Sequence, residues 1–117
     1  MKKIYHLSTC DTSRRILEEL DVPDGTELQD IKATPINPEQ LEALKNTAGS
    51  YEALFSKRAR LYRERNLKER SLDERDFREL LLEHYTFLKR PVVVVDDAVF
   101  IGNAAKTVAA AKEALHS

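Results

Sequence analysis

Residues 90–102, RPVVVVDDAVFIG, constrain the fold more than any other segment of this chain. Four consecutive valines at 92–95 favour a β-strand, and because they are apolar on both faces, the strand belongs in the interior of a sheet. The DDA triplet that follows predicts a tight connection to a second strand at 99–102. The segment is therefore expected to form a hairpin whose first strand is central.

The remaining strand signals lie near the N-terminus. Residues 3–7 suit a short strand, and the stretch 26–32 is interpreted as another, although its apolar residues fit no clean period of two. A helix is expected to follow Cys10 and to end at the turn residues 21–25. After the hairpin, Asn103 is predicted to cap a C-terminal helix.

Residues 37–85 are expected to form a block of helices. Asn37 precedes Pro38 and Gln40, a combination that predicts an N-terminal capping box with proline at the first helical position. Gly49 is expected to end this first helix of the block.

The rest of the block shows helical spacing as well. Residues 50–67 are interpreted as a second helical stretch, with apolar side chains recurring between charges. Ser71 and Glu74 are predicted to form a capping box for a third helix, which ends near His84.

The order of these elements predicts an α/β fold in which helices cover a sheet. A length of 117 residues corresponds to one domain, spanning residues 1–117. No segment repeats at a fixed period, which excludes a solenoid.

Composition excludes several classes of protein. The sequence has no apolar run long enough for a transmembrane helix and no signal-peptide pattern, so a cytoplasmic protein without membrane association is expected. The single cysteine cannot form an internal disulfide, and the three histidines, at 6, 84 and 116, show no zinc-ligand spacing. No metal site is expected.

Charge is spread unevenly along the chain. Residues 57–70 carry seven basic and two acidic side chains, whereas the whole chain has a net charge of −1. Such a block forms either a solvated helical face, the commoner case, or a surface for an anionic partner. Direct nucleic-acid binding is not expected, because Tyr62 is the only aromatic residue in the block and no groove-reading motif is present.

Cys10 is the strongest candidate for a reactive residue. At the start of a helix, unpaired backbone N–H groups and the positive end of the helix dipole stabilise a thiolate, the reactive form of cysteine. Thr12 and Ser13 can donate hydrogen bonds to an anion there, and Arg14 adds a positive charge. A lone cysteine is, however, often only a small buried apolar residue. Spacing alone leaves these two interpretations evenly balanced.

Two neighbours can change the reactivity of Cys10. His6, at the end of the first predicted strand, is placed to hydrogen-bond the thiolate, or is simply a packed histidine. Asp11 disfavours formation of the Cys10 thiolate if its negatively charged carboxylate points towards the sulfur.

The turn Cys10-Asp-Thr-Ser13-Arg14 after a short strand, together with FLKRPVVVVDDAVFIGN at 87–103, resembles the arsenate reductase (ArsC) and Spx-like family. The resemblance covers nearly the whole chain. It implies a thioredoxin-like fold: a mixed sheet of about four strands flanked by helices, with a helical insertion between strands 2 and 3, here about 37–85.

The resemblance also implies roles for particular residues. Cys10 corresponds to the nucleophile of a CxxS-type turn, with Arg14 and Arg90 assisting it and Pro91 following a cis peptide bond. The cis state is implied by the resemblance alone, since only about 5–6% of X-Pro bonds are cis in folded proteins. Thr12, Ser13, Arg58 and Pro91 are the expected substrate-binding residues.

The reaction implied by the family is reduction of arsenate. The thiolate attacks the oxyanion, glutathione displaces the arsenic adduct, and glutaredoxin clears the mixed disulfide, so that one cysteine suffices and glutathione is a co-substrate rather than a bound cofactor. Three arginines normally hold the oxyanion in this family. Here only Arg90 matches, because Ser56 and Asn103 stand at the other two positions. The stretch 56–62, with Arg58, is closer to the Spx-like branch.

Two further interpretations stay open. Spx-like regulators bind the RNA polymerase α subunit and usually carry a CxxC pair, but Ser13 replaces the second cysteine, so a disulfide switch within this chain is impossible. The basic stretch 57–70 then serves a protein partner. The third interpretation keeps the fold with an inactive site.

Overall fold

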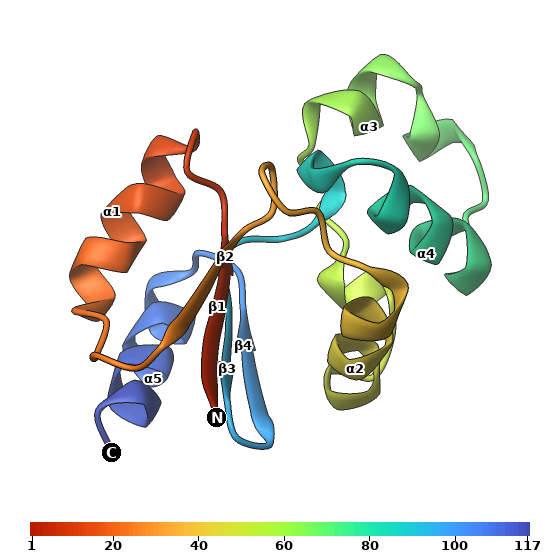
Figure 1. The fold of residues 1–117 in the computed structure, drawn as a ribbon. Helices are drawn as coiled ribbons and strands as arrows, with labels where there is room; N and C mark the ends of the chain where they lie inside the picture. The colour runs from red at the N-terminus through yellow and green to blue at the C-terminus, as the bar shows by residue number, and fades with distance from the viewer. The chain divides into compact units, whose positions relative to one another are not determined.

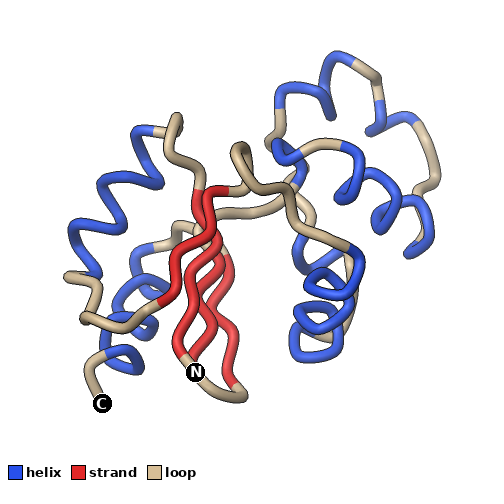
Figure 2. Tube along the Cα trace, viewed as in Figure 1, coloured by secondary structure: helices blue, strands red, loops and turns tan.

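The computed structural model describes all residues from 1 to 117, and the chain divides into two compact units. The first unit joins Met1–Thr34 to Arg90–Ser117 and contains every strand, drawn red in Figure 2. The second unit, Pro35–Lys89, contains helices and turns but no strand of the sheet. The helical insertion expected at about 37–85 therefore corresponds to the second unit. The assignment of residues 1–117 to a single domain stays a prediction.

The sheet of the first unit has four strands, in the order β2-β1-β3-β4. Their bounds are Lys2–His6 for β1, Glu27–Asp30 for β2, Val92–Val95 for β3 and Ala98–Ile101 for β4. Strand β1 pairs in parallel with β2 and antiparallel with β3, which pairs antiparallel with β4. The mixed α/β sheet and the hairpin are thus confirmed, with the valine run as an interior strand.

Helices α1, Asp11–Leu20, and α5, Ala105–Leu115, lie together on one face of this sheet (Figure 1). Ile4 and Val93 are cross-strand neighbours and present their side chains to both helices. The core cluster consists of Ile4, Ile16, Leu20, Val93, Val108, Ala111 and Leu115. Hydrophobic burial by residues from both ends of the chain thus holds α1, and with it Cys10, against the sheet.

The start of α5 differs from the prediction. Ala104, not Asn103, is the residue that precedes the helix, and no side chain caps its first turn. The chain turns sharply at Gly102, whose φ of 96° suits glycine and whose N–H donates to the Pro91 carbonyl. This turn leaves Asn103 exposed and one position too early to cap the helix.

The second unit begins as predicted. Asn37 and Gln40 form the capping box of α2, Pro38–Ala48, and Gly49 ends the helix in a left-handed conformation. The other helices of the unit are the 3₁₀ turn η1 at Glu52–Leu54, α3 at Arg60–Glu64, the 3₁₀ turn η2 at Leu67–Glu69, α4 at Glu74–Glu83 and the 3₁₀ turn η3 at Tyr85–Phe87.

The helical stretch predicted for 50–67 is wrong as one continuous element. It is broken after η1, where Phe55 becomes extended and forms an isolated β-bridge with Leu88. The ring of Phe55 stacks on Phe87 at 5.2 Å and packs against Phe77 at 4.9 Å. This packing between segments distant in sequence outweighs the local helical preference.

The capping box predicted at Ser71 is also wrong. Asp73 caps α4 by accepting from the Asp76 N–H, and Asp76 accepts from the Asp73 N–H in return. The Glu74 carboxylate instead accepts from the N–H groups of Tyr51 and Glu52. Aspartate caps at least as well as serine, and the helix begins after Asp73 rather than after Ser71.

Two general features bear on function. None of the helices combines the length and the apolar character needed to cross a membrane. No three His, Cys, Asp or Glu side chains lie close enough together to hold a metal ion.

Candidate functional site

Cys10 lies where the chain leaves β1 and enters α1. Its N–H donates to the Leu7 carbonyl at 3.1 Å, which closes a tight turn, and its own carbonyl accepts from the Arg14 N–H at 3.0 Å. Cys10 is therefore the N-cap residue of α1, and no side chain forms a capping hydrogen bond at this end of the helix. The residue is half-buried rather than sealed in the core. The residue thus lies at the end of α1 where the first-turn N–H groups have no partner within the helix, and part of it is exposed to solvent.

Ser13 holds the loop in which Cys10 lies. Its side chain is 1% exposed, and its hydroxyl oxygen accepts a hydrogen bond from the Leu7 N–H at 3.2 Å. This bond satisfies a buried backbone group that would otherwise be unpaired. The structure thus shows a positioning contact for Ser13, which the sequence did not suggest. Thr12 is half-buried in the same helical turn.

Arg14 forms an ion pair with the carboxylate of Asp11, three residues before it on α1. Both side chains lie at the surface, with exposed fractions of 59% for Arg14 and 91% for Asp11. The pair follows from the spacing, because residues three apart are neighbours on a helix. The arginine expected to assist Cys10 is therefore engaged by a carboxylate from the same turn.

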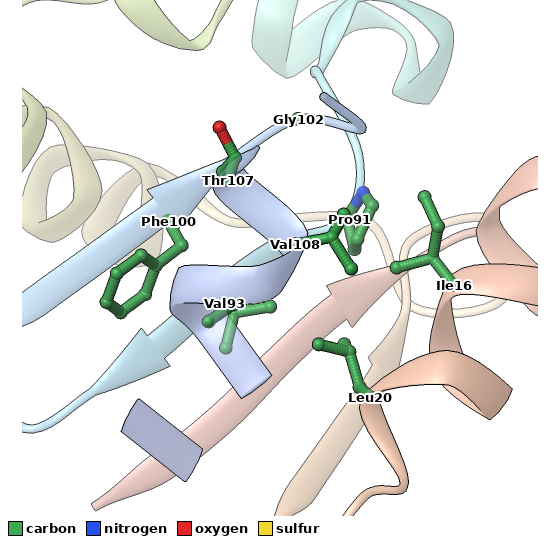
Figure 3. A pocket seen from close by; sticks show the side chains of 9 residues that line it. Ile16, Leu20, Pro91, Val93, Phe100, Gly102, Thr107 and Val108 are labelled. Atoms are coloured by element: carbon green, nitrogen blue, oxygen red, sulfur yellow. The ribbon is translucent and has the colours of Figure 1, made fainter. Parts of the chain in front are cut away.

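The Arg90–Pro91 peptide bond is cis, as the family resemblance implied. Arg90 is half-buried, and Pro91 is buried at the entry to β3. Pro91 shares an apolar pocket with Ile16 of α1 and Val108 of α5 (Figure 3). This pocket is lined by neither Cys10 nor a charged residue, so it marks the packing of α1 and α5 rather than a substrate site.

His6 ends β1, and its register partner on β2 is Asp30. The Nδ1 atom of His6 is buried and has no hydrogen-bond partner, while its backbone carbonyl accepts from the Ile31 N–H at 2.9 Å. Asp30 in turn accepts from the Ser8 hydroxyl at 2.6 Å and from the Ser8 N–H at 3.3 Å. The loop that leads to Cys10 is therefore tied to β2, a link that sequence analysis missed.

These contacts change the acidity of Asp30. The Ser8 hydroxyl, which outweighs the opposing effect of burial, holds the pKa of the Asp30 carboxyl below its ordinary value, with smaller contributions from the Lys32 and Ser8 N–H groups and from His6. A carboxylate with a lowered pKa stabilises the fold above the pKa of the unfolded chain. This contribution is lost as the pH falls through the folded-state pKa.

Replacing Ser8 with alanine is expected to raise the pKa of Asp30 towards the ordinary aspartate value near 3.9. The contribution of Asp30 to stability then becomes smaller and is lost at a higher pH. Titration of the Asp30 carboxyl carbon by NMR measures the change. Asp96, whose pKa is lowered by the N-terminal amine, serves as the internal control and should not move. An unchanged Asp30 pKa would show that the Ser8 hydroxyl is not its main partner.

Two of the predicted site positions lie in the second unit. Ser56 follows η1, where its N–H donates to the Phe87 carbonyl at 2.7 Å and its hydroxyl accepts from the Arg58 N–H at 3.3 Å. The side chain of Arg58 is exposed. Their participation in the Cys10 site stays a prediction.

Comparison with known proteins agrees with this arrangement. Residues 5–111 match the model of the ArsC family. The chain belongs to the ArsC family. The cis Arg90–Pro91 bond, the cysteine at the start of α1 and the helical unit between β2 and β3 are the features that the family resemblance implied.

A curated relative is similar to most of this chain. A curated arsenate reductase of Yersinia enterocolitica is 29% identical over 93 residues, which cover 78% of this chain and 66% of the relative. The chain thus spans just under two thirds of the length of that relative.

Solved structures of ArsC-family proteins share the fold. The arsenate reductase from Vibrio cholerae has a TM-score of 0.76 and 26% identity, covering 93% of this chain and 95% of its own. A putative arsenate reductase from Yersinia pestis, at 23% identity, supports the fold alone, with a TM-score of 0.75 and coverage of 94% and 99%. The thioredoxin-like fold predicted from the sequence is confirmed.

Proposed function

We propose that this ArsC-family protein is a thiol-dependent reductase in which the Cys10 thiolate is the nucleophile. Its substrate is an electrophilic oxyanion such as arsenate, or a glutathione mixed disulfide. The observation that carries the proposal is the position of Cys10, half-buried at a helix start that no side chain caps. The similarity to a curated arsenate reductase supports the same chemistry.

The first step uses the charge distribution at the start of α1. Backbone N–H groups and the helix dipole stabilise the Cys10 thiolate and a bound anion. The thiolate attacks arsenic and one arsenate oxygen leaves as water. Glutathione then attacks the Cys10 sulfur, so that arsenic departs as arsenite and the two sulfurs, which supplied two electrons, are joined in a disulfide. A second thiol, from glutaredoxin or glutathione, restores Cys10.

The surrounding residues are assigned supporting roles. Arg14 and Arg90 bring positive charge to the oxyanion, Thr12 supplies a hydroxyl donor, and His6 is available as a proton donor or acceptor near the thiol. Because Ser56 and Asn103 stand where the family has arginines, charge from this chain is lower than in authentic arsenate reductases. Arg58 is proposed to compensate in part. The reaction is proposed to occur in the cytoplasm, where glutathione keeps thiols reduced.

Mass spectrometry of the intact protein tests the proposal. After incubation with arsenate and reduced glutathione, we expect either an arsenic adduct on Cys10, which requires arsenate, or a glutathione adduct, which requires both reagents. After incubation with glutathione disulfide alone, we expect the glutathione adduct. Because Cys10 is the only cysteine, any thiol adduct is assigned without ambiguity. A protein that forms no adduct under either condition is not a thiol-dependent reductase.

A second candidate function is supported by the surface of the second unit. Arg58, Arg63, Lys68 and Arg70 are exposed, and no carboxylate pairs with them. Such side chains suit an acidic protein partner, such as the RNA polymerase α subunit that Spx-like proteins bind. The adduct experiment separates the two functions, since a protein that acts only through this surface needs no reactive Cys10.

A further inference from the structure

Asp11 is a negatively charged residue inside the turn that the proposed reaction uses. It is the first residue of α1 and directly follows Cys10. Its side chain is 91% exposed, and its carboxylate pairs with Arg14. No buried group requires this charge. Asp11 is therefore free to influence what binds beside Cys10 without being needed for the core.

The carboxylate opposes a bound anion in three ways. It competes with the anion for the guanidinium of Arg14. Its negative charge lies in the first turn of α1 and offsets part of the positive potential of the helix dipole, which an incoming anion would otherwise use. It also repels the anion directly, and this repulsion doubles when the ion carries two charges instead of one. A neutral substrate experiences none of these effects.

The other charged groups of the first unit do not cancel this effect completely. Asp30 adds a second carboxylate, held through Ser8 two residues before Cys10. Arg15 and Arg90 supply positive charge in the same unit, where Arg15 is exposed on α1 and Arg90 is half-buried. The loop thus has two carboxylates beside it, Asp11 next to Cys10 and Asp30 bonded to Ser8, where a dianion would require a clear excess of positive charge.

We propose that Asp11 is a specificity-determining residue, which weakens binding of doubly charged oxyanions at Cys10 and so favours disulfides such as those of glutathione, whose charged groups lie several bonds away from the reacting sulfur. The inference rests on the proposed function and narrows its substrate class. In the favoured reaction, the Cys10 thiolate attacks a glutathione mixed disulfide, forming Cys10–glutathione disulfide and releasing the other thiol. A second glutathione attacks that disulfide, restores the Cys10 thiolate and leaves as glutathione disulfide, so one disulfide is consumed and one is formed.

The test measures how well inorganic sulfate, an unreactive dianion, protects Cys10 from alkylation by iodoacetamide. The half-protecting sulfate concentration is compared for the unaltered protein and the Asp11→Asn protein, at constant low ionic strength. We expect this concentration to fall about three- to tenfold in Asp11→Asn, and the difference to shrink in high salt. For nitrate, which carries one charge, the change should be only about the square root of that factor.

Two control variants separate charge from structure. Asp11→Glu keeps the charge and should bind sulfate within about twofold of the unaltered protein. Asp24→Asn removes an equal charge from an exposed turn beyond the other end of α1 and should have no effect. The half-protecting concentration is the sulfate concentration at which the alkylation rate of a variant falls to half of its own rate without sulfate. It therefore does not depend on how fast each variant is alkylated.

The possible results distinguish this inference from the proposed function. Equal half-protecting concentrations for the unaltered and Asp11→Asn proteins would overturn the role of Asp11. Absence of protection in both proteins would overturn it too, because there would be no anion site for Asp11 to oppose. In either case, adduct formation on Cys10 with glutathione disulfide still decides separately whether the protein is a thiol-dependent reductase.

Discussion

Replacing Cys10 with serine is expected to lower the rate of disulfide or arsenate reduction by about a thousandfold or more. A serine hydroxyl is not ionised at neutral pH and cannot form the mixed disulfide through which electrons pass. The rate is measured with glutathione and glutaredoxin, by following the glutathione disulfide produced.

The fold of the Cys10→Ser protein provides the control. Cys10 makes only backbone hydrogen bonds, to Leu7 and Arg14, and both are kept in the variant. Circular dichroism and the midpoint of thermal unfolding should therefore change little. A correctly folded Cys10→Ser protein that keeps full activity would rule out Cys10 as the nucleophile.

Replacing Leu20 with alanine is expected to lower the free energy of unfolding by about 2–5 kcal/mol. The side chain of Leu20 is 0% exposed and packs in the core that joins α1 to the sheet and to α5. Removing it takes away buried apolar surface and leaves a cavity that the neighbouring side chains fill only in part. The loss is measured by denaturant unfolding in the presence of a reducing agent.

Leu28 offers a matched control in the same unit. It is also a leucine, but it lies on β2 with 49% of its surface exposed. The Leu28→Ala change should therefore cost less than about 1 kcal/mol. If both variants lost the same stability, the core assigned to α1, β1, β3 and α5 would be wrong.

Much of the fold could be predicted because its signals are local. The valine run at 92–95 has one reasonable interpretation, an interior strand, and its apolar character on both faces is decided by the residues themselves. The capping box of Asn37 and Gln40 likewise involves residues three apart, so both partners are visible in one short window. Cys10 at the start of a helix follows from the same kind of spacing.

Other features were missed because their partners are far apart in the chain. Phe55 is extended rather than helical because it pairs with Leu88, which lies 33 residues further along the chain. The tie between Ser8 and Asp30 depends on β1 and β2 lying side by side, which no local window shows. The cap predicted at Ser71 was wrong because Asp73, two residues later, is also a good capping residue and is the one that caps α4.

By itself, the sequence determined the thioredoxin-like class, the helical insertion and the choice of Cys10 as the candidate nucleophile, because spacing, capping residues and family motifs act over short stretches of chain. Only the tertiary structure showed that the Ser13 hydroxyl oxygen accepts a hydrogen bond from the Leu7 N–H. It alone also showed that Asp30 anchors the loop and that Cys10 remains partly open to solvent. The reason is physical: burial and long-range hydrogen bonds depend on which segments meet, and that is settled by packing of the whole unit rather than by any one segment.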